Sequence, residues 1–132
     1  MLIRDFAERF IKADQKVVLE GDYDDREKLE DPGVIYHNLA SGQDRVGRDA
    51  AKLHSLGLRQ AFSSRRREWK YLAGEGNCFA LSFKEHSMFT GRAPDLPPPT
   101  GKEVKIDLLF VFRVEDGRIV EAWNNGTTTG LT

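Results

Sequence analysis

Two neighbouring residues and one distant carboxylate could move a proton or hold a developing negative charge. His37 has an ordinary pKa close to neutral pH, so its imidazole could act as a general base. Asn38 cannot accept a proton, but its amide can donate a hydrogen bond to an enolate or carbonyl oxygen. Asp14 could serve as a general acid or base, because burial raises the pKa of a carboxyl group. These residue types suit removal of a proton next to a carbonyl group.

Both titratable groups also have an ordinary structural explanation. Asp14 could pair with a buried arginine, for which Arg48 and Arg59 are the candidates. His37 could make a single structural hydrogen bond within a strand. The residues leave both choices open, and a perturbed titration of either group inside a pocket would favour catalysis.

An amphipathic helix at the start of the chain positions Asp14. Its inward stripe has apolar residues spaced by three and four positions: Ile3, Phe6, Ala7, Phe10, Val17 and Val18. Asp14 follows Phe10 by four positions, so both side chains should face the interior, where Phe10 could hold an aromatic ligand. Gly21 ends this helix, and a short second helix over residues 24–30 stops before Pro32.

A strand predicted over residues 34–39 positions His37 and Asn38. Successive side chains of a strand point to opposite faces, so His37 must face away from its two neighbours. Only one of the two sets can therefore line a pocket. A third helix is predicted over residues 49–62, with His54 on its surface.

Two further strands follow in the middle of the chain. The basic run at residues 65–67 is predicted to lie on the outer face of the first, as the alternative to a phosphate-binding patch. From residue 79 onward, apolar and polar side chains alternate, which places His86 on the polar side unless a bulge intervenes. His86 is a candidate for the mouth of a pocket. The prolines between residues 94 and 99 predict a rigid loop.

A hairpin centred on the dipeptide Asp-Gly at 116–117 is predicted for the end of the chain, because this pair supplies the positive φ angles of a tight turn. Counting outward from a two-residue turn gives three pairs: Phe112 with Glu121, Phe110 with Trp123, and Leu108 with Asn125. Directly paired residues share a face of the sheet, so Glu121, Trp123 and Asn125 should lie on the apolar face, where Phe110 and Trp123 would hold the rings of a ligand. On that face Glu121 and Asn125 either line a pocket and contact a ligand, or lie at a solvent-exposed edge of the sheet.

Motifs along nearly the whole chain carry a resemblance to a known family. They are Gly-Asp-Tyr-Asp at 21–24, Val-Ile-Tyr-His-Asn at 34–38, Val-Gly-Arg-Asp-Ala at 46–50, Pro-Pro-Thr-Gly-Lys at 98–102 and Phe-Arg-Val-Glu-Asp-Gly-Arg-Ile-Val-Glu-Ala-Trp at 112–123. In this order and spacing the chain resembles the SnoaL-like polyketide cyclases of the nuclear transport factor 2 superfamily. The resemblance implies an α+β fold with a central pocket, in which a cone-shaped, curved antiparallel sheet packs on three N-terminal helices. It also implies a homodimer formed through the sheet.

The resemblance also bears on the site residues. Ketosteroid isomerases of the same superfamily place a polar residue on the first helix, as Asp14 would be, and a base aspartate close to the position of Asn38. Many relatives of the cyclase family carry an aspartate where this chain has Phe110. The nearest acid, Asp107, should face away from Phe110. The catalytic carboxylate of the family is therefore either absent here or replaced by Asp14 or Glu121.

The composition fits a single domain over residues 1–132. Twenty Lys plus Arg against 21 Asp plus Glu give a net charge of −1, so no overall field attracts nucleic acid or an anionic membrane. The one cysteine, Cys78, excludes an internal disulfide, and no Cys/His spacing resembles a zinc site. Charges interrupt the apolar residues of the first helix, which argues against a signal peptide or membrane span. We therefore expect a cytoplasmic protein without metal or cofactor.

Two main functions are compatible with these residues. One is a cofactor-free lyase or isomerase of the cyclase kind, acting on a small apolar or aromatic carbonyl compound in a buried pocket. The other is a noncatalytic small-molecule-binding or accessory module of the same fold. A third, purely structural role would be dimerisation through the outer face of the sheet. Because one fold serves many functions, the choice depends on which polar side chains meet inside the pocket.

Overall fold

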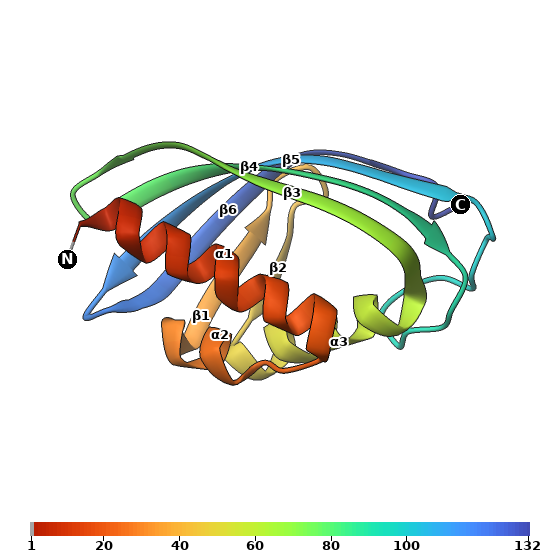
Figure 1. The fold of residues 1–132 in the computed structure, drawn as a ribbon, viewed down its shortest axis with the longest axis horizontal. Helices are drawn as coiled ribbons and strands as arrows, with labels where there is room; N and C mark the ends of the chain where they lie inside the picture. Colours follow the sequence, from red (N-terminus) through yellow and green to blue (C-terminus); the bar gives the residue numbers. More distant parts are fainter. Residues whose placement is uncertain (1) are drawn as a thin grey trace.

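The computed structural model describes residues 2–132 (Figure 1). Helices and strands follow one another in this order: α1 (Ile3–Glu20), α2 (Asp24–Leu29), β1 (Glu30–Asn38), β2 (Gln43–Val46), α3 (Arg48–Ala61), β3 (Phe62–Glu75), β4 (Cys78–Phe89), β5 (Glu103–Glu115) and β6 (Arg118–Thr129). The three helices end within one residue of the predicted ends. Gly21 takes the left-handed conformation after α1 at φ 69°, which no side chain with a Cβ adopts easily.

All six strands form one sheet in the order β2-β1-β6-β5-β4-β3. Every neighbouring pair is antiparallel except β1 and β6, which run parallel, so the sheet is mixed where a fully antiparallel one was expected. In Figure 1 the long strands arch over α1, and all three helices lie on the same side of the sheet. The fold is therefore α+β with three helices on a curved sheet, as predicted.

The main core lies between α1 and the inner face of the sheet. Phe6 and Phe10 of α1 pack against Phe79 of β4 and Phe112 of β5, and the ring centroids of Phe10 and Phe112 are 4.9 Å apart. Each of these rings is almost fully buried, which stabilises the fold by about 1.5–3 kcal/mol per side chain. The stripe predicted for α1 thus fixes its inward face.

A second, smaller core holds the proline-rich loop against the sheet. Phe62, Phe89 and Val104 form its centre, and Ala93 and Leu96 of the loop pack on it. This anchoring fixes the position of Asp95, which lies between these two loop residues.

The hairpin of β5 and β6 forms at the predicted turn but in a different register beyond it. Asp116 and Gly117 have φ angles of 51° and 74°. The pairs Glu115–Arg118 and Val114–Ile119 follow as counted, and then Arg113 pairs with Glu121, which leaves Val120 without a partner. This bulge reverses the face of every later residue of β6.

The three predicted pairs were therefore wrong. Phe112 pairs with Ala122 and Phe110 with Asn124, while Leu108 pairs with Gly126. Glu121, Trp123 and Asn125 consequently lie on the outer face of the sheet. No Gly or Pro marks the bulge, so the residues around Val120 give no sign of it.

The first strands also differ from their predictions. β1 begins at Glu30, four residues before the predicted start, and its pairing with β6 is irregular between Glu30 and Ile35. β2 was not predicted, since three of its four side chains are polar and show no alternation. β2 nevertheless matters for the site, because it lies at the sheet edge next to β1. No helix among residues 2–132 is long and apolar enough to cross a membrane.

Candidate functional site

The helices and the inner face of the sheet enclose a cavity of about 630 Å³. One wall is aromatic and comes from α1 and three strands: Phe10, Trp69, Phe83, Phe110 and Phe112. Phe10 and Trp69 pack edge to face with centroids 5.7 Å apart, Trp69 and Phe110 are tilted at 5.3 Å, and Phe110 and Phe112 are stacked at 5.6 Å. Phe10 and Phe110 thus lie in the wall of the cavity, where they were predicted. The wall offers a surface suited to flat apolar molecules.

Asp14 lines this cavity, but its carboxylate is fully engaged. Its Oδ1 accepts a hydrogen bond from Arg26 at 2.8 Å, and its Oδ2 accepts others from Arg67 at 2.8 Å and Trp69 Nε1 at 2.9 Å. Burial alone would raise the pKa of Asp14, but the two guanidinium charges and these hydrogen bonds outweigh burial and lower it. The raised pKa expected for catalysis was wrong, and the arginine partners are neither Arg48 nor Arg59.

The ion pairs continue from Asp14 along β3 and β4. Arg67 and Arg65 both bind Glu85, which is 1 % exposed, and Arg65 does so through two hydrogen bonds of 2.8 and 2.9 Å. The prediction that the basic run lies on the outer face was wrong for these two residues. Strand alternation sends only Arg66 outward and aims its neighbours at an inward carboxylate. The network stabilises the floor of the cavity and leaves Asp14 and Glu85 without a role as bases.

On the α2 side, Arg26 extends the same network to Glu30. The Glu30 carboxylate is fully buried and accepts hydrogen bonds from the hydroxyl groups of Tyr23 and Tyr36. Burial, together with the charge of Glu30, raises the pKa of both tyrosines well above the usual range, although the Arg26 charge acts in the opposite direction. These phenols therefore remain protonated and act as hydrogen-bond donors.

His54 of α3 also lines the cavity, together with Asp95 of the proline-rich loop. His54 Nδ1 lies 2.6 Å from Asp95 Oδ2, and we call these two residues the dyad. Burial and the positive charge of Arg45 lower the pKa of His54, although Asp95 acts in the opposite direction. His54 Nε2 has no hydrogen-bond partner among residues 2–132. A neutral imidazole held through Nδ1 by a carboxylate, with its other nitrogen unoccupied, has the arrangement of a general base.

Two amide side chains complete the polar part of the wall. Asn38 of β1 and Asn124 of β6 are register partners and both line the cavity. Asn38 thus belongs to the set of β1 side chains that lines the cavity, while Asn124 replaces Trp123 opposite Phe110 because of the bulge. Amide N–H groups at this point could donate hydrogen bonds to a ligand oxygen.

His37 lies on the opposite, outer face of the sheet. Its Nδ1 is 2.7 Å from Asp44 Oδ1 and its Nε2 is 2.6 Å from Glu121 Oε2, and its ring stacks on Trp123 with centroids 5.6 Å apart. The hydrogen bonds to Glu121 and Asp44 raise the pKa of His37. We call His37, Asp44 and Glu121 the outer cluster. Both ring nitrogens are occupied, so His37 does not meet the cavity residues and the hypothesis that it acts there as a base is wrong.

The remaining predicted residues also lie outside the cavity. Asp107 is exposed and pairs across the sheet with Lys84 and Thr127. Asn125 is exposed, and its side chain accepts a hydrogen bond from the backbone N–H of Gly126. Strand alternation accounts for Asp107, and the bulge at Val120 accounts for Asn125 as it does for Glu121 and Trp123.

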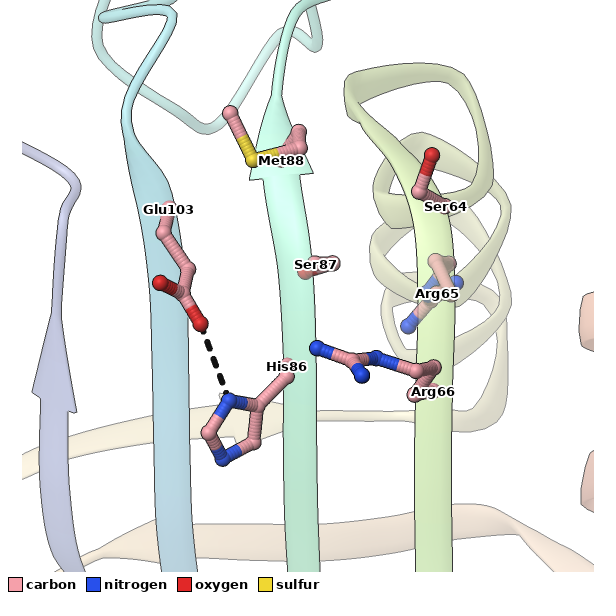
Figure 2. Close-up of a pocket in the computed structure, with 7 residues that line it drawn as sticks. All are labelled: Ser64, Arg65, Arg66, His86, Ser87, Met88 and Glu103. Carbon is pink, nitrogen blue, oxygen red and sulfur yellow. Dashed lines mark hydrogen bonds and ion pairs between the residues drawn. The ribbon is translucent and has the colours of Figure 1, made fainter.

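His86 lies in a separate, shallow pocket of about 560 Å³ on the outer face (Figure 2). Figure 2 shows its imidazole turned toward Glu103 of β5, with Nδ1 2.9 Å from Glu103 Oε1. The pocket forms where a second bulge interrupts the pairing of β3 and β4 between Ser63 and Arg66. His86 therefore lines a pocket, but not the mouth of the aromatic cavity.

The cavity residues that sequence reasoning missed include His54, Asp95, Asn124 and Trp69. His54 was assigned to the surface, although it follows Ala51 by three positions on the buried side of α3. Asp95 stands in an irregular loop, for which no periodicity predicts a direction. Among residues 2–132 no three His, Cys, Asp or Glu side chains are grouped so that they could hold a metal ion.

Comparisons with known proteins agree with the architecture. A family model described as SnoaL-like polyketide cyclase matches residues 8–128. No curated protein gives a significant match to the sequence. The solved structures with similar folds include AclR from Streptomyces galilaeus, a candidate hydroxylase, which is 19% identical with a TM-score of 0.72, over 97% of this chain and 81% of that one.

Two further structures have the same fold. IdmH from Streptomyces antibioticus, a candidate polyketide cyclase, is 22% identical with a TM-score of 0.69, over 100% of this chain and 95% of that one. SalBIII, an epoxide hydrolase/cyclase-like enzyme of pyran ring formation in the polyether salinomycin, is 20% identical with a TM-score of 0.69, over 92% and 90%. The family match spans most of the chain, so the protein belongs to the SnoaL-like polyketide cyclase family.

Proposed function

We propose that the protein is a cofactor-free cyclase or isomerase that removes a proton next to the carbonyl group of a small apolar or aromatic compound. The observation that supports this proposal is the dyad, in which His54 lines the aromatic cavity with Nε2 free and Nδ1 held by Asp95 at 2.6 Å. A lowered pKa keeps the imidazole neutral and able to accept a proton at neutral pH. Family membership and the cyclase-like neighbours support the same reaction class.

The proton transfer begins with His54 Nε2, which takes the proton from the carbon next to the carbonyl group. The electron pair of the broken C–H bond forms the enolate, and its negative charge moves to the carbonyl oxygen. Asn38 and Asn124 supply amide N–H groups that can hydrogen-bond this oxygen. Asp95 stabilises the imidazolium that forms on His54.

The enolate then has two outcomes that need no further reagent. In ring closure its carbon attacks a second carbonyl carbon of the same molecule, a C–C bond forms, and the new alkoxide takes the proton from His54. In isomerisation the proton returns from His54 to a different carbon. The aromatic wall would hold the rings in the required orientation, which lowers the barrier by reducing the motions open to the reacting atoms.

The test uses a carbonyl compound whose proton exchange can be followed without knowing the natural substrate. β-Tetralone, a bicyclic aromatic ketone, is incubated with the protein in D₂O, and the loss of its α-protons is followed by NMR. We expect the wild-type protein to accelerate exchange and His54→Gln to lower the protein-dependent rate by about 10²–10⁴-fold.

Equal rates for wild type and His54→Gln would overturn the assignment of His54 as the base. His37→Gln is the matched control, since this histidine lies on the other face of the sheet and should leave the rate unchanged. A wild-type protein that binds β-tetralone without accelerating exchange would support the noncatalytic binding module instead. That alternative is favoured by one observation, the engagement of Asp14 and Glu85 in ion pairs at the cavity floor.

A further inference from the structure

Arg45 on β2 is a half-buried cation without a counterion in contact. It is the register partner of Tyr36, so its side chain is on the inner face of the sheet, and it lines the aromatic cavity. Among residues 2–132 it makes no hydrogen bond and no ion pair within 4.0 Å. Removing a guanidinium from water without a partner is unfavourable, and burial accordingly lowers the pKa of Arg45.

The carboxylates that line the cavity are already bound to other residues. Asp14 forms ion pairs with Arg26 and Arg67, and Glu85 forms ion pairs with Arg65 and Arg67. Asp95 accepts a hydrogen bond from the neutral imidazole of His54. Asp44, the fourth, binds His37 in the outer cluster. Asp95 attracts Arg45 through space but lies beyond ion-pair distance of it. Arg45 is thus the cation of the cavity that no carboxylate of the described chain contacts.

The cavity therefore combines an aromatic wall with one guanidinium that no other side chain of residues 2–132 binds. Each carboxylate that lines it already has a hydrogen-bond partner.

We propose that the cavity binds an aromatic or apolar molecule that carries a carboxylate, and that Arg45 is the residue that recognises this carboxylate. The inference rests on the proposed function, because it names the class of substrate for the same cavity. A guanidinium binds a carboxylate through two parallel hydrogen bonds, which gives both affinity and orientation. Since Arg45 lies near the dyad, the bound carboxylate would fix the molecule relative to His54.

The test compares two ligands of nearly equal shape that differ in charge. Binding of naphthoate and of the neutral naphthamide is measured by isothermal titration calorimetry at neutral pH. We expect the wild-type protein to bind naphthoate about tenfold or more tightly than naphthamide, as a charge-assisted hydrogen-bonded pair does. Arg45→Gln should remove this preference and leave naphthamide binding unchanged, whereas Arg45→Lys should keep part of it.

Arg66→Gln is the matched control, because Arg66 is exposed on the outer face of the same sheet (Figure 2). It should keep the full preference for naphthoate. The thermal unfolding temperature of each variant checks that it is folded, and Arg45 has no partner whose loss would lower it. Equal affinity of the wild-type protein for both ligands, or an unchanged preference for naphthoate in Arg45→Gln, would overturn the inference. The role of His54 would not be affected, because the exchange of β-tetralone tests it separately. If neither ligand binds, the inference fails, and the proposed function also loses its apolar cavity site.

Discussion

Two of the histidine–carboxylate groups lie on opposite sides of one sheet, and they differ in nearly every property that matters for catalysis. In the dyad, His54 has one carboxylate partner and a free Nε2, and it is partly buried beside the cation Arg45. In the outer cluster, His37 has a carboxylate on each ring nitrogen. Burial and a like charge lower the pKa of the first imidazole, whereas two hydrogen-bonded carboxylates raise the pKa of the second.

An ordinary pKa near neutrality does not by itself identify a histidine as a catalytic base. His37 holds its proton more tightly and has no lone pair free for a substrate, so its charge serves to join β1, β2 and β6 on the outer face. His54 remains neutral and has an open nitrogen on the cavity side. The face of the sheet, rather than the type of residue, decides between the two roles.

The largest loss of stability is expected for a buried carboxylate of α1, in contrast to a carboxylate on the outer face of the sheet. Asp14→Asn should lower the free energy of unfolding by about 3–5 kcal/mol, because it leaves Arg26 and Arg67 buried without their counterion. Glu121→Gln should change it little, since water solvates this pair on the outer face. Urea unfolding of both variants measures the difference. A similar loss in the free energy of unfolding for Asp14→Asn and Glu121→Gln would contradict the difference in burial between the two carboxylates.

The next effect contrasts the carboxylate partners of the two histidines. Asp95→Asn should slow the exchange of β-tetralone by about ten- to hundredfold, because the charge-assisted hydrogen bond to His54 Nδ1 contributes about 1.5–3 kcal/mol. Asp44→Asn removes the equivalent bond to His37 and should leave the exchange rate unchanged. A loss of rate in Asp44→Asn instead would move the catalytic site to the outer face.

Most helices and strands could be predicted from local periodicity. The stripe of α1, the left-handed Gly21 and the turn at residues 116–117 each depend on a few neighbouring residues, so they could be predicted. The parallel pairing of β1 with β6 could not, because it joins segments that are distant in the sequence and have no turn between them. Short-range rules therefore gave every element except β2, but not the complete arrangement of the sheet.

The site was predicted less well, for two physical reasons. A single extra residue, Val120, reversed the face of Glu121, Trp123 and Asn125, since the side-chain period of a strand is two. The dyad joins a helix to an irregular loop, so only the folded chain brings Asp95 to His54. Phe10 and Phe110 line the cavity as predicted because the period of α1 and the alternation of β5 are not interrupted.

A direct measurement of both titrations would test whether the pKa values of His54 and His37 shift in opposite directions. Proton NMR of the imidazole resonances should give a pKa below 6.5 for His54 and above 6.5 for His37. The variants His54→Gln and His37→Gln assign the two signals. The protein-dependent exchange of β-tetralone should then rise with pH through the lower of the two pKa values, since only the neutral imidazole accepts a proton. A rate that follows the higher value would identify His37 as the base.

The smallest effect is the pH dependence of stability. His37 has a pKa in the folded state above its unfolded value of 6.5, so its contribution is fully present below pH 6.5 and is lost as the pH rises through the folded pKa. His54 has the opposite shift, so the unfolded chain binds its proton more readily, and stability rises with pH from its folded pKa up to 6.5. The test is the thermal unfolding temperature as a function of pH. His37→Gln should reduce its fall above pH 6.5, and His54→Gln should reduce its rise below pH 6.5. The same flattening in both variants would mean that the two faces do not tune their histidines in opposite directions.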